Sequence, residues 1–153
     1  MTLAQHLGKH FRQAYFGGSF TERNLRDELS AIPLAAARRT TAGGNSVIAI
    51  VYHLHFYVRG VAGVLGGGPV DTRDRASWET PAIDTEGDWR AFVTEVLTEG
   101  EAFAKTLEAL PDEELWKPFY RPTNAATLTN ALGILEHVYY HLGQVVLLAR
   151  GDD

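Results

Sequence analysis

The sequence predicts an all-α protein, a four-helix bundle with a short extra helix after the first long one. Four long segments carry apolar residues at helical spacing, and capping residues precede three of them. No segment gives a convincing β-strand. The chain has 153 residues, of which 45% are hydrophobic, so we expect a single domain over residues 1–153 with one core.

A capping box and a proline organise the N-terminal part of this predicted bundle. Thr2 and Gln5 have the spacing of a capping box, and helical periodicity then continues over about residues 3–16. A short amphipathic helix is expected from Thr21 onward, and Pro33 breaks it.

The other three long helices are predicted from their caps and their periodicity. The second follows a cap at Asn45 or Ser46, and the third follows a second capping box, formed by Thr85 with Asp88. These helices end near residue 65 and residue 110, and the last one covers about residues 127–150. A loop over residues 69–83 separates the second from the third, and long loops in compact domains often cover functional sites.

Composition excludes several classes of protein. A net charge of -5, with 14 scattered basic residues, offers no binding surface for nucleic acid or an anionic membrane, so neither is an expected partner. The chain has no cysteine, so any metal must be held by nitrogen and oxygen ligands.

The amino terminus lacks the features of a secretion signal, and a cytoplasmic location is expected. The apolar stretch "VIAIVYHLHFYV" is shorter than the roughly 20 residues of a membrane-spanning helix, and is expected to be a core helix.

The last predicted helix carries two histidines, His137 and His141, four residues apart. Positions four apart differ by about 40° around a helix axis, so the two imidazoles can share one ion. Periodicity alone also permits the alternative in which the opposite, leucine-rich face is the core and the histidines face water. The histidine face has no charged residue between positions 130 and 148, however, so both faces are expected to be covered. One would line the interior and the other would meet the partner of a homodimer.

A third ligand must come from another helix, and the second long helix offers two histidines. His53 and His55 lie about 200° apart around the axis, so only one can face a given ion. Small residues share the face of His53, which makes His53 the candidate, whereas His55 lies beside Arg59 and is expected to be exposed or at an interface. His6 and His10 in the first helix are also four apart, but they flank its apolar stripe and are expected to be solvated.

The segments "NSVIAIVYHLHFYVRG" and "GILEHVYYHLGQVVLL" resemble the DinB-like (YfiT-like) metalloenzyme family, whose members are four-helix bundles with a three-histidine metal site. The resemblance extends over most of the chain. It implies that His53, His137 and His141 hold a divalent ion, with zinc and nickel as the first candidates and iron and manganese as alternatives. No fourth protein ligand is evident from the sequence, so an open coordination position is implied.

An ion with an open position can act as a Lewis acid on water or bind a thiolate. The resemblance therefore implies a metal-dependent transferase or hydrolase, with a small-molecule substrate such as a low-molecular-weight thiol. Residues expected to hydrogen-bond the imidazoles or orient bound water are Gln144, Tyr140, Asn130 and Tyr57. The alternative is a non-catalytic dimeric helical module, for binding or stress response, without a functional metal.

Two loops carry aromatic residues that could shape the mouth of such a site. Trp78 lies in the long loop, and Trp116, Phe119 and Tyr120 lie in the loop before the last helix. The favoured interpretation is the simpler one, in which these aromatic side chains cap the ends of the core.

Overall fold

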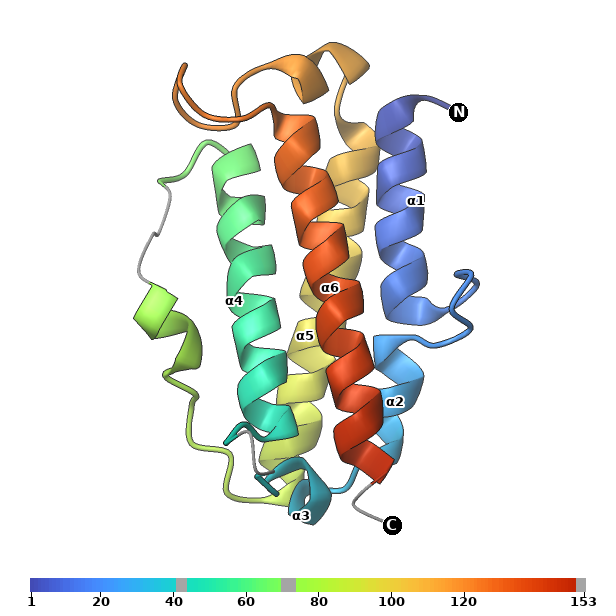
Figure 1. Cartoon of the computed structure of the whole chain (residues 1–153), viewed down its shortest axis with the longest axis vertical. Helices are drawn as coiled ribbons and strands as arrows, with labels where there is room; N and C mark the ends of the chain where they lie inside the picture. The colour runs from blue at the N-terminus through green and yellow to red at the C-terminus, as the bar shows by residue number, and fades with distance from the viewer. Residues whose placement is uncertain (41–43, 70–73, 151–153) are drawn as a thin grey trace.

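All the regular secondary-structure elements among the described residues are helices. The computed structural model describes residues 1–40, 44–69 and 74–150, and it assigns no strand among them. Four long helices lie side by side (Figure 1), namely α1 (Leu3–Phe16), α4 (Val47–Leu65), α5 (Glu86–Ala109) and α6 (Thr127–Arg150). The shorter elements are α2 (Leu25–Ala31), α3 (Leu34–Ala37), η1 (Asp74–Trp78) and η2 (Asp112–Trp116). The predicted all-helical class is confirmed.

The predicted helix starts agree with the observed caps. The Thr2 hydroxyl accepts a hydrogen bond from the Gln5 backbone N–H, and the Gln5 side chain accepts one from the Thr2 backbone. Thr85 and Asp88 make the same reciprocal pair at the start of α5. Ser46, rather than Asn45, caps α4. Each cap satisfies backbone donors that the first turn of a helix leaves without an internal acceptor.

The single short helix predicted after α1 is two helices in the structure. The first, α2, begins only after Asn24, whose side-chain oxygen accepts from the Asp27 backbone N–H. Pro33 then separates α2 from α3 because its ring cannot continue the preceding turn. The predicted start at Thr21 was therefore too early, since a better capping residue follows it by three positions.

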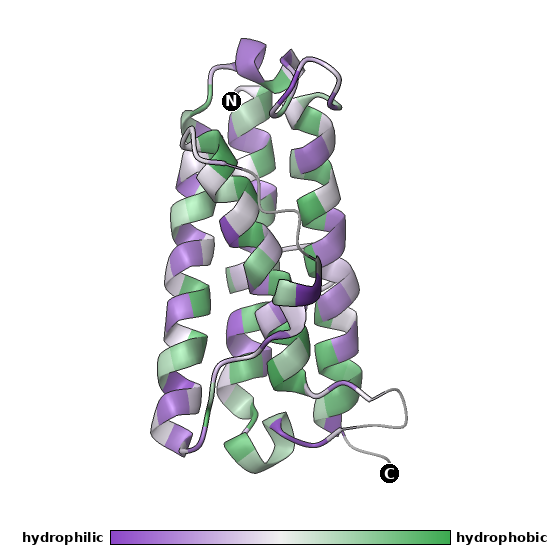
Figure 2. Ribbon diagram, turned by 90° about the vertical axis from the view of Figure 1, so that its left-hand side faces the viewer, coloured by the Kyte–Doolittle hydropathy of each residue, from purple (hydrophilic) through white to green (hydrophobic). Residues whose placement is uncertain are grey.

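The four long helices enclose one apolar core. α1 packs closely along α5, and α4 packs along α6. The largest fully buried side chains include Trp89, Phe103, Tyr15 and Phe11 of α5 and α1, and α2, α4 and η2 contribute smaller ones such as Leu25, Leu54 and Leu115. Figure 2 shows hydrophilic and hydrophobic residues recurring along each long helix, which is typical of helices that bury one face and expose another.

The most apolar helix, α4, is long enough to cross a membrane by length and composition alone. Half of its apolar window is buried inside the fold, however, and the helix carries two buried histidines, His53 and His55. The neighbouring helices α5 and α6 cover these side chains. These features are those of a core helix.

An aspartate distant in sequence holds the start of α1. Asp112, at the start of η2, accepts hydrogen bonds from the backbone N–H groups of Leu3 (3.0 Å) and Ala4 (2.9 Å). These two hydrogen bonds, to Ala4 first and Leu3 second, lower the pKa of the Asp112 carboxyl. The carboxylate therefore ties α1 to the loop before α6.

We expect Asp112→Ala to lower the thermal midpoint by a few degrees at pH 7, because two backbone donors of α1 lose a charged acceptor. A depressed pKa in the folded state stabilises the protein above the ordinary aspartate pKa of about 4, and this stabilisation is lost as the pH falls through the folded-state pKa. The difference between variant and wild type should therefore shrink in acid. Thermal unfolding at pH 7 and pH 3, with Glu113→Gln as the control, would check this. A pH-independent difference would contradict it.

Candidate metal centre

Three imidazoles from two helices meet inside the fold. The Nε2 atom of His137 lies 3.3 Å from Nε2 of His53 and 2.8 Å from Nε2 of His141. One ring nitrogen from each of the three histidines lies within 4.8 Å of the other two. The structure thus brings together the three histidines that the sequence analysis singled out.

The packing of α4 against α6 produces this arrangement. His137 and His141 are one helical turn apart on α6 and point toward α4, where His53 faces them. His53 and His141 are buried, with 8% and 5% of their surface exposed, and His137 is half-buried. The alternative in which the α6 histidines face bulk water is wrong for His141.

Gln144, one turn further along α6, fixes the tautomer of His141. The side-chain oxygen Oε1 of Gln144 lies 2.7 Å from His141 Nδ1. Because an amide oxygen only accepts, Nδ1 must carry the proton, and a neutral ring then presents its Nε2 lone pair to the other imidazoles. The Gln144 amide nitrogen donates to the Tyr140 hydroxyl at 3.3 Å, which agrees with this orientation of the amide.

The segment η1 covers His53 on the other side. The Ser77 hydroxyl is buried and lies 2.8 Å from His53 Nδ1, and the Trp78 indole stacks on the His53 ring at a centroid distance of 3.9 Å. No feature of the sequence points to Ser77, since it lies 24 residues from His53 in a loop without periodicity. Trp78, favoured there as a cap over the end of the core, instead lies against a candidate ligand.

Of the four predicted supporting residues, three lie at the histidines and one does not. Gln144 contacts His141 directly, and the Tyr140 ring lies 4.9 Å from the His141 ring. The Tyr57 ring meets both His53 and His137 edge-on, at 5.0 and 5.1 Å. The Asn130 amide instead donates to the carbonyl of Ala126 within its own helix. The structure therefore gives Asn130 no hydrogen bond to the imidazoles.

The environment keeps the α6 imidazoles neutral near pH 7. Burial, followed by the neighbouring rings of His141 and His53, lowers the pKa of His137 to about 4. Burial also lowers the pKa of His141, although its hydrogen bond to Gln144 acts in the opposite direction. Neutral imidazole is the form that binds metal ions.

Two of the three nitrogen–nitrogen distances are close to those around a single divalent ion, and the third is within 4.8 Å. Zinc–nitrogen bonds of about 2.0–2.1 Å at tetrahedral angles place neighbouring ligand nitrogens roughly 3.3 Å apart. The distance from His53 to His137, 3.3 Å, matches that value. The distance from His137 to His141, 2.8 Å, would have to lengthen slightly for both nitrogens to bind one ion. Hydrogen bonds at the opposite nitrogens of His53 and His141 orient those two rings, as is usual for metal-binding histidines.

His55 lies elsewhere, and its expected exposure was wrong. The residue is 1% exposed and faces α5, where its Nε2 atom lies 3.2 Å from Glu99 Oε2. Burial, followed by the charge of Arg59, lowers the pKa of His55 to about 4, so the ring is neutral near pH 7. The adjacent Arg59 suggested a solvated face, but the long glutamates of α5 and Arg59 itself cover the ring.

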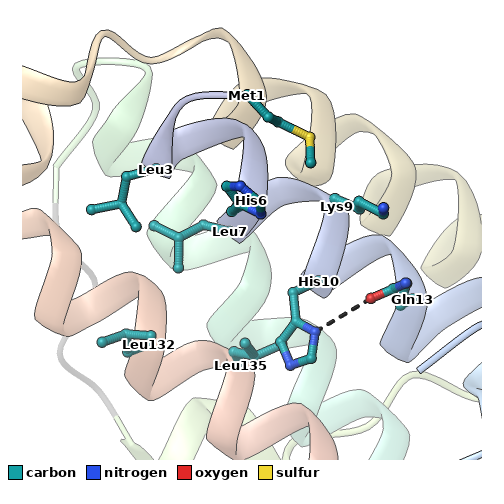
Figure 3. Close-up of a pocket in the computed structure, with 9 residues that line it drawn as sticks. All are labelled: Met1, Leu3, His6, Leu7, Lys9, His10, Gln13, Leu132 and Leu135. Atoms are coloured by element: carbon teal, nitrogen blue, oxygen red, sulfur yellow. Dashed lines mark hydrogen bonds between the residues drawn. The ribbon is translucent and has the colours of Figure 1, made fainter. Parts of the chain in front are cut away.

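His6 and His10 are both exposed, as predicted. They line a cavity of about 390 Å³ between α1 and α6 (Figure 3), together with mainly aliphatic side chains and Lys9. The His10 ring makes a hydrogen-bond contact of 3.3 Å with Gln13. None of the three clustered histidines lines this cavity, which therefore belongs to a different part of the surface.

The aromatic loop before α6 lies at one end of the helices, beside the starts of α1 and α6 (Figure 1). Trp116 and Tyr120 are exposed there, whereas Leu115 is fully buried. The backbone of Lys117 accepts hydrogen bonds from Thr127 at the start of α6. This loop is thus attached to the helix ends.

Comparison with known proteins gives one family. The family model described as the DinB superfamily matches residues 19–145, a range that contains all three clustered histidines. No curated protein and no solved structure matches the chain.

Proposed function

Because this chain belongs to the DinB superfamily, we propose that it is a metal-dependent enzyme whose divalent ion is bound by His53, His137 and His141. The observation that carries the proposal is the convergence of one ring nitrogen from each histidine within 4.8 Å. The four long helices would then constitute a DinB-like four-helix bundle, in one domain that spans the chain.

A divalent ion held by three neutral imidazoles keeps its full positive charge, and an open coordination position makes it a Lewis acid for water or a thiolate. Zinc and nickel are the first candidates for this ion, and iron and manganese are the alternatives, since all four accept imidazole ligands.

The residues around the histidines have distinct roles in this proposal. Gln144 holds His141 in the tautomer that leaves Nε2 free to bind a metal, and the Ser77 hydroxyl positions the ring of His53. Trp78 and Tyr57 place aromatic surface against the ligand rings and limit the access of water. Together they would orient the ligands and shape an entrance that is partly apolar.

The proposed reaction is thiol-dependent transfer or hydrolysis on a small-molecule substrate, with a low-molecular-weight thiol as the co-substrate. We expect the protein to act in the cytoplasm without nucleic acid or membrane partners. The exposed side of α6 carries Leu132, Tyr140 and Leu147, and this apolar surface supports a homodimer.

The first test is metal content, measured by elemental analysis of protein purified without a histidine tag. We expect about one tightly bound ion per chain in the wild type and loss of that ion in His53→Ala and His137→Ala, because two imidazoles seldom retain an ion alone. His10→Ala, which removes an exposed histidine, is the control and should keep the ion. Undiminished metal in His137→Ala would rule out this ligand set.

The thiol component needs a separate measurement. Cobalt-substituted protein titrated with 2-mercaptoethanol should develop a sulfur-to-metal charge-transfer band if the open position accepts a thiolate. A spectrum that does not change with thiol would argue against thiol chemistry while leaving the metal site intact. Protein that binds no metal at all would favour the non-catalytic dimeric module.

A further inference from the structure

A second group of potential metal ligands lies between α4 and α5, on the other side of α4 from the three clustered histidines. His55 of α4 faces Glu95 and Glu99, which are one helical turn apart on α5. One ligand atom from each of these three residues lies within 4.8 Å of the other two. The His55 Nε2 atom is 3.2 Å from Glu99 Oε2 and 3.9 Å from Glu95 Oε1.

The ring nitrogens of His55 are buried, and the neighbouring groups among the described residues do not satisfy their hydrogen-bonding capacity. The residue is 1% exposed, and neither of its ring nitrogens makes a hydrogen bond with the residues that the structure describes. A buried imidazole of this kind is unfavourable, because both nitrogens have lost water without gaining a hydrogen bond. Its Nε2 atom nevertheless lies close to two carboxylates, which are half-exposed and free to adjust.

We propose that His55, Glu95 and Glu99 form a second, weaker divalent-cation site, with one imidazole nitrogen and one oxygen from each carboxylate as ligands. This mixture of nitrogen and oxygen ligands suits Zn²⁺, which binds histidine and glutamate at about 2.0–2.2 Å. An ion there would give the buried ring a partner and join α4 to α5. The proposal is independent of the function proposed for the three clustered histidines.

Arg59 would compete with this ion for the two carboxylates. Its Nη1 lies 3.5 Å from Glu95 Oε1, and its Nε lies 3.4 Å from Glu99 Oε2. Both distances are longer than the 2.7–2.9 Å or so of a strong charge-assisted hydrogen bond, and the side chain is 56% exposed. Exposed ion pairs of this kind contribute little, so the guanidinium can move into solvent when an ion binds.

Space for further ligands exists beside the ring. A cavity of about 300 Å³ is lined by His55 and Arg59, together with Tyr52, Phe56 and Gly60 of the same helix. Water molecules in that cavity could approach the His55 side of the site. The three protein ligands would then form an open site, and competition from Arg59 for both carboxylates would make it weaker than the site at the three clustered histidines.

The test is calorimetric titration of metal-free, full-length protein with Zn²⁺. We expect two classes of binding in the wild type, with the weaker class lost in Glu95→Gln/Glu99→Gln. That class should persist in Glu22→Gln/Glu113→Gln, which removes two exposed carboxylates elsewhere. Absence of the weaker class in the wild type, or its survival in Glu95→Gln/Glu99→Gln, would overturn the proposal.

Two further variants separate this site from the histidine cluster and from general charge effects. His137→Ala/His141→Ala should lose only the tighter class, so failure at one site is distinguishable from failure at the other. Arg59→Gln should tighten the weaker class by a factor of about 2–5, because it removes a competing cation. Unchanged Zn²⁺ affinity in Arg59→Gln would contradict the idea that the ion and the guanidinium share these carboxylates.

Discussion

The Gly8→Ala variant is expected to be about 3 kcal/mol less stable than the wild type, at the upper end of the range for overpacked sites. A Cβ atom at Gly8 would lie 2.6 Å from the backbone carbonyl oxygen of Ala104 and 3.0 Å from the Glu108 backbone nitrogen. Backbone atoms in α5 cannot rotate away as a side chain can. The helices α1 and α5 would have to separate, which loosens the packing of both.

Thermal unfolding provides the measurement. For a chain of this size, about 2–4 °C of thermal midpoint corresponds to 1 kcal/mol, so the midpoint should fall by roughly 6–12 °C. The control is Gly133→Ala on α6, where an added Cβ meets no atom within 4 Å. That variant should gain about 0.5–1 kcal/mol, because alanine is a better helix former than glycine. Equal effects of the two substitutions would contradict the close approach of α1 to α5.

The second large effect is stabilisation by metal. An ion that binds only the folded protein adds about 4 kcal/mol when its free concentration is a thousand times its Kd. We therefore expect saturating Zn²⁺ or Ni²⁺ to raise the thermal midpoint by roughly 8–16 °C, and an excess of chelator to reverse the rise. The three imidazoles come from two helices, so the ion would oppose the separation of α4 from α6.

The His141→Ala variant distinguishes binding at the cluster from binding elsewhere. His141 contributes one of the three converging nitrogens, and its loss should abolish most of the metal-induced shift. The matched control is His6→Ala, which removes an exposed histidine of a pair with the same spacing. If the His141→Ala protein kept the full shift, the stabilising ion would bind somewhere other than the three clustered histidines.

Much of the secondary structure could be predicted from local sequence. The capping boxes at Thr2 and Thr85 are local hydrogen-bond patterns, and both form as expected. The one clear error in the helix pattern, a single short helix in place of α2 and α3, concerns a segment where Asn24 and Pro33 compete with a weak apolar period. Short helices give few turns of periodicity, so a single capping residue decides where they begin.

The candidate centre was predictable only in part. Spacing on one helix determines that His137 and His141 can point the same way, and that His53 and His55 cannot. Spacing gives no information on Ser77, which reaches His53 from a loop without periodicity. Contacts of that kind depend on where a loop returns to the fold.

The sequence by itself determined four long helices, the capping boxes that begin two of them and the angular relation of the histidines within each helix. Those properties follow from hydrogen bonds and side-chain spacing over a few residues. Tertiary structure decided that the α6 histidines face α4, that Ser77 and Trp78 cover His53, and that His55 is buried against α5. Each of these depends on how separate elements pack together, which the periodicity of one helix cannot specify.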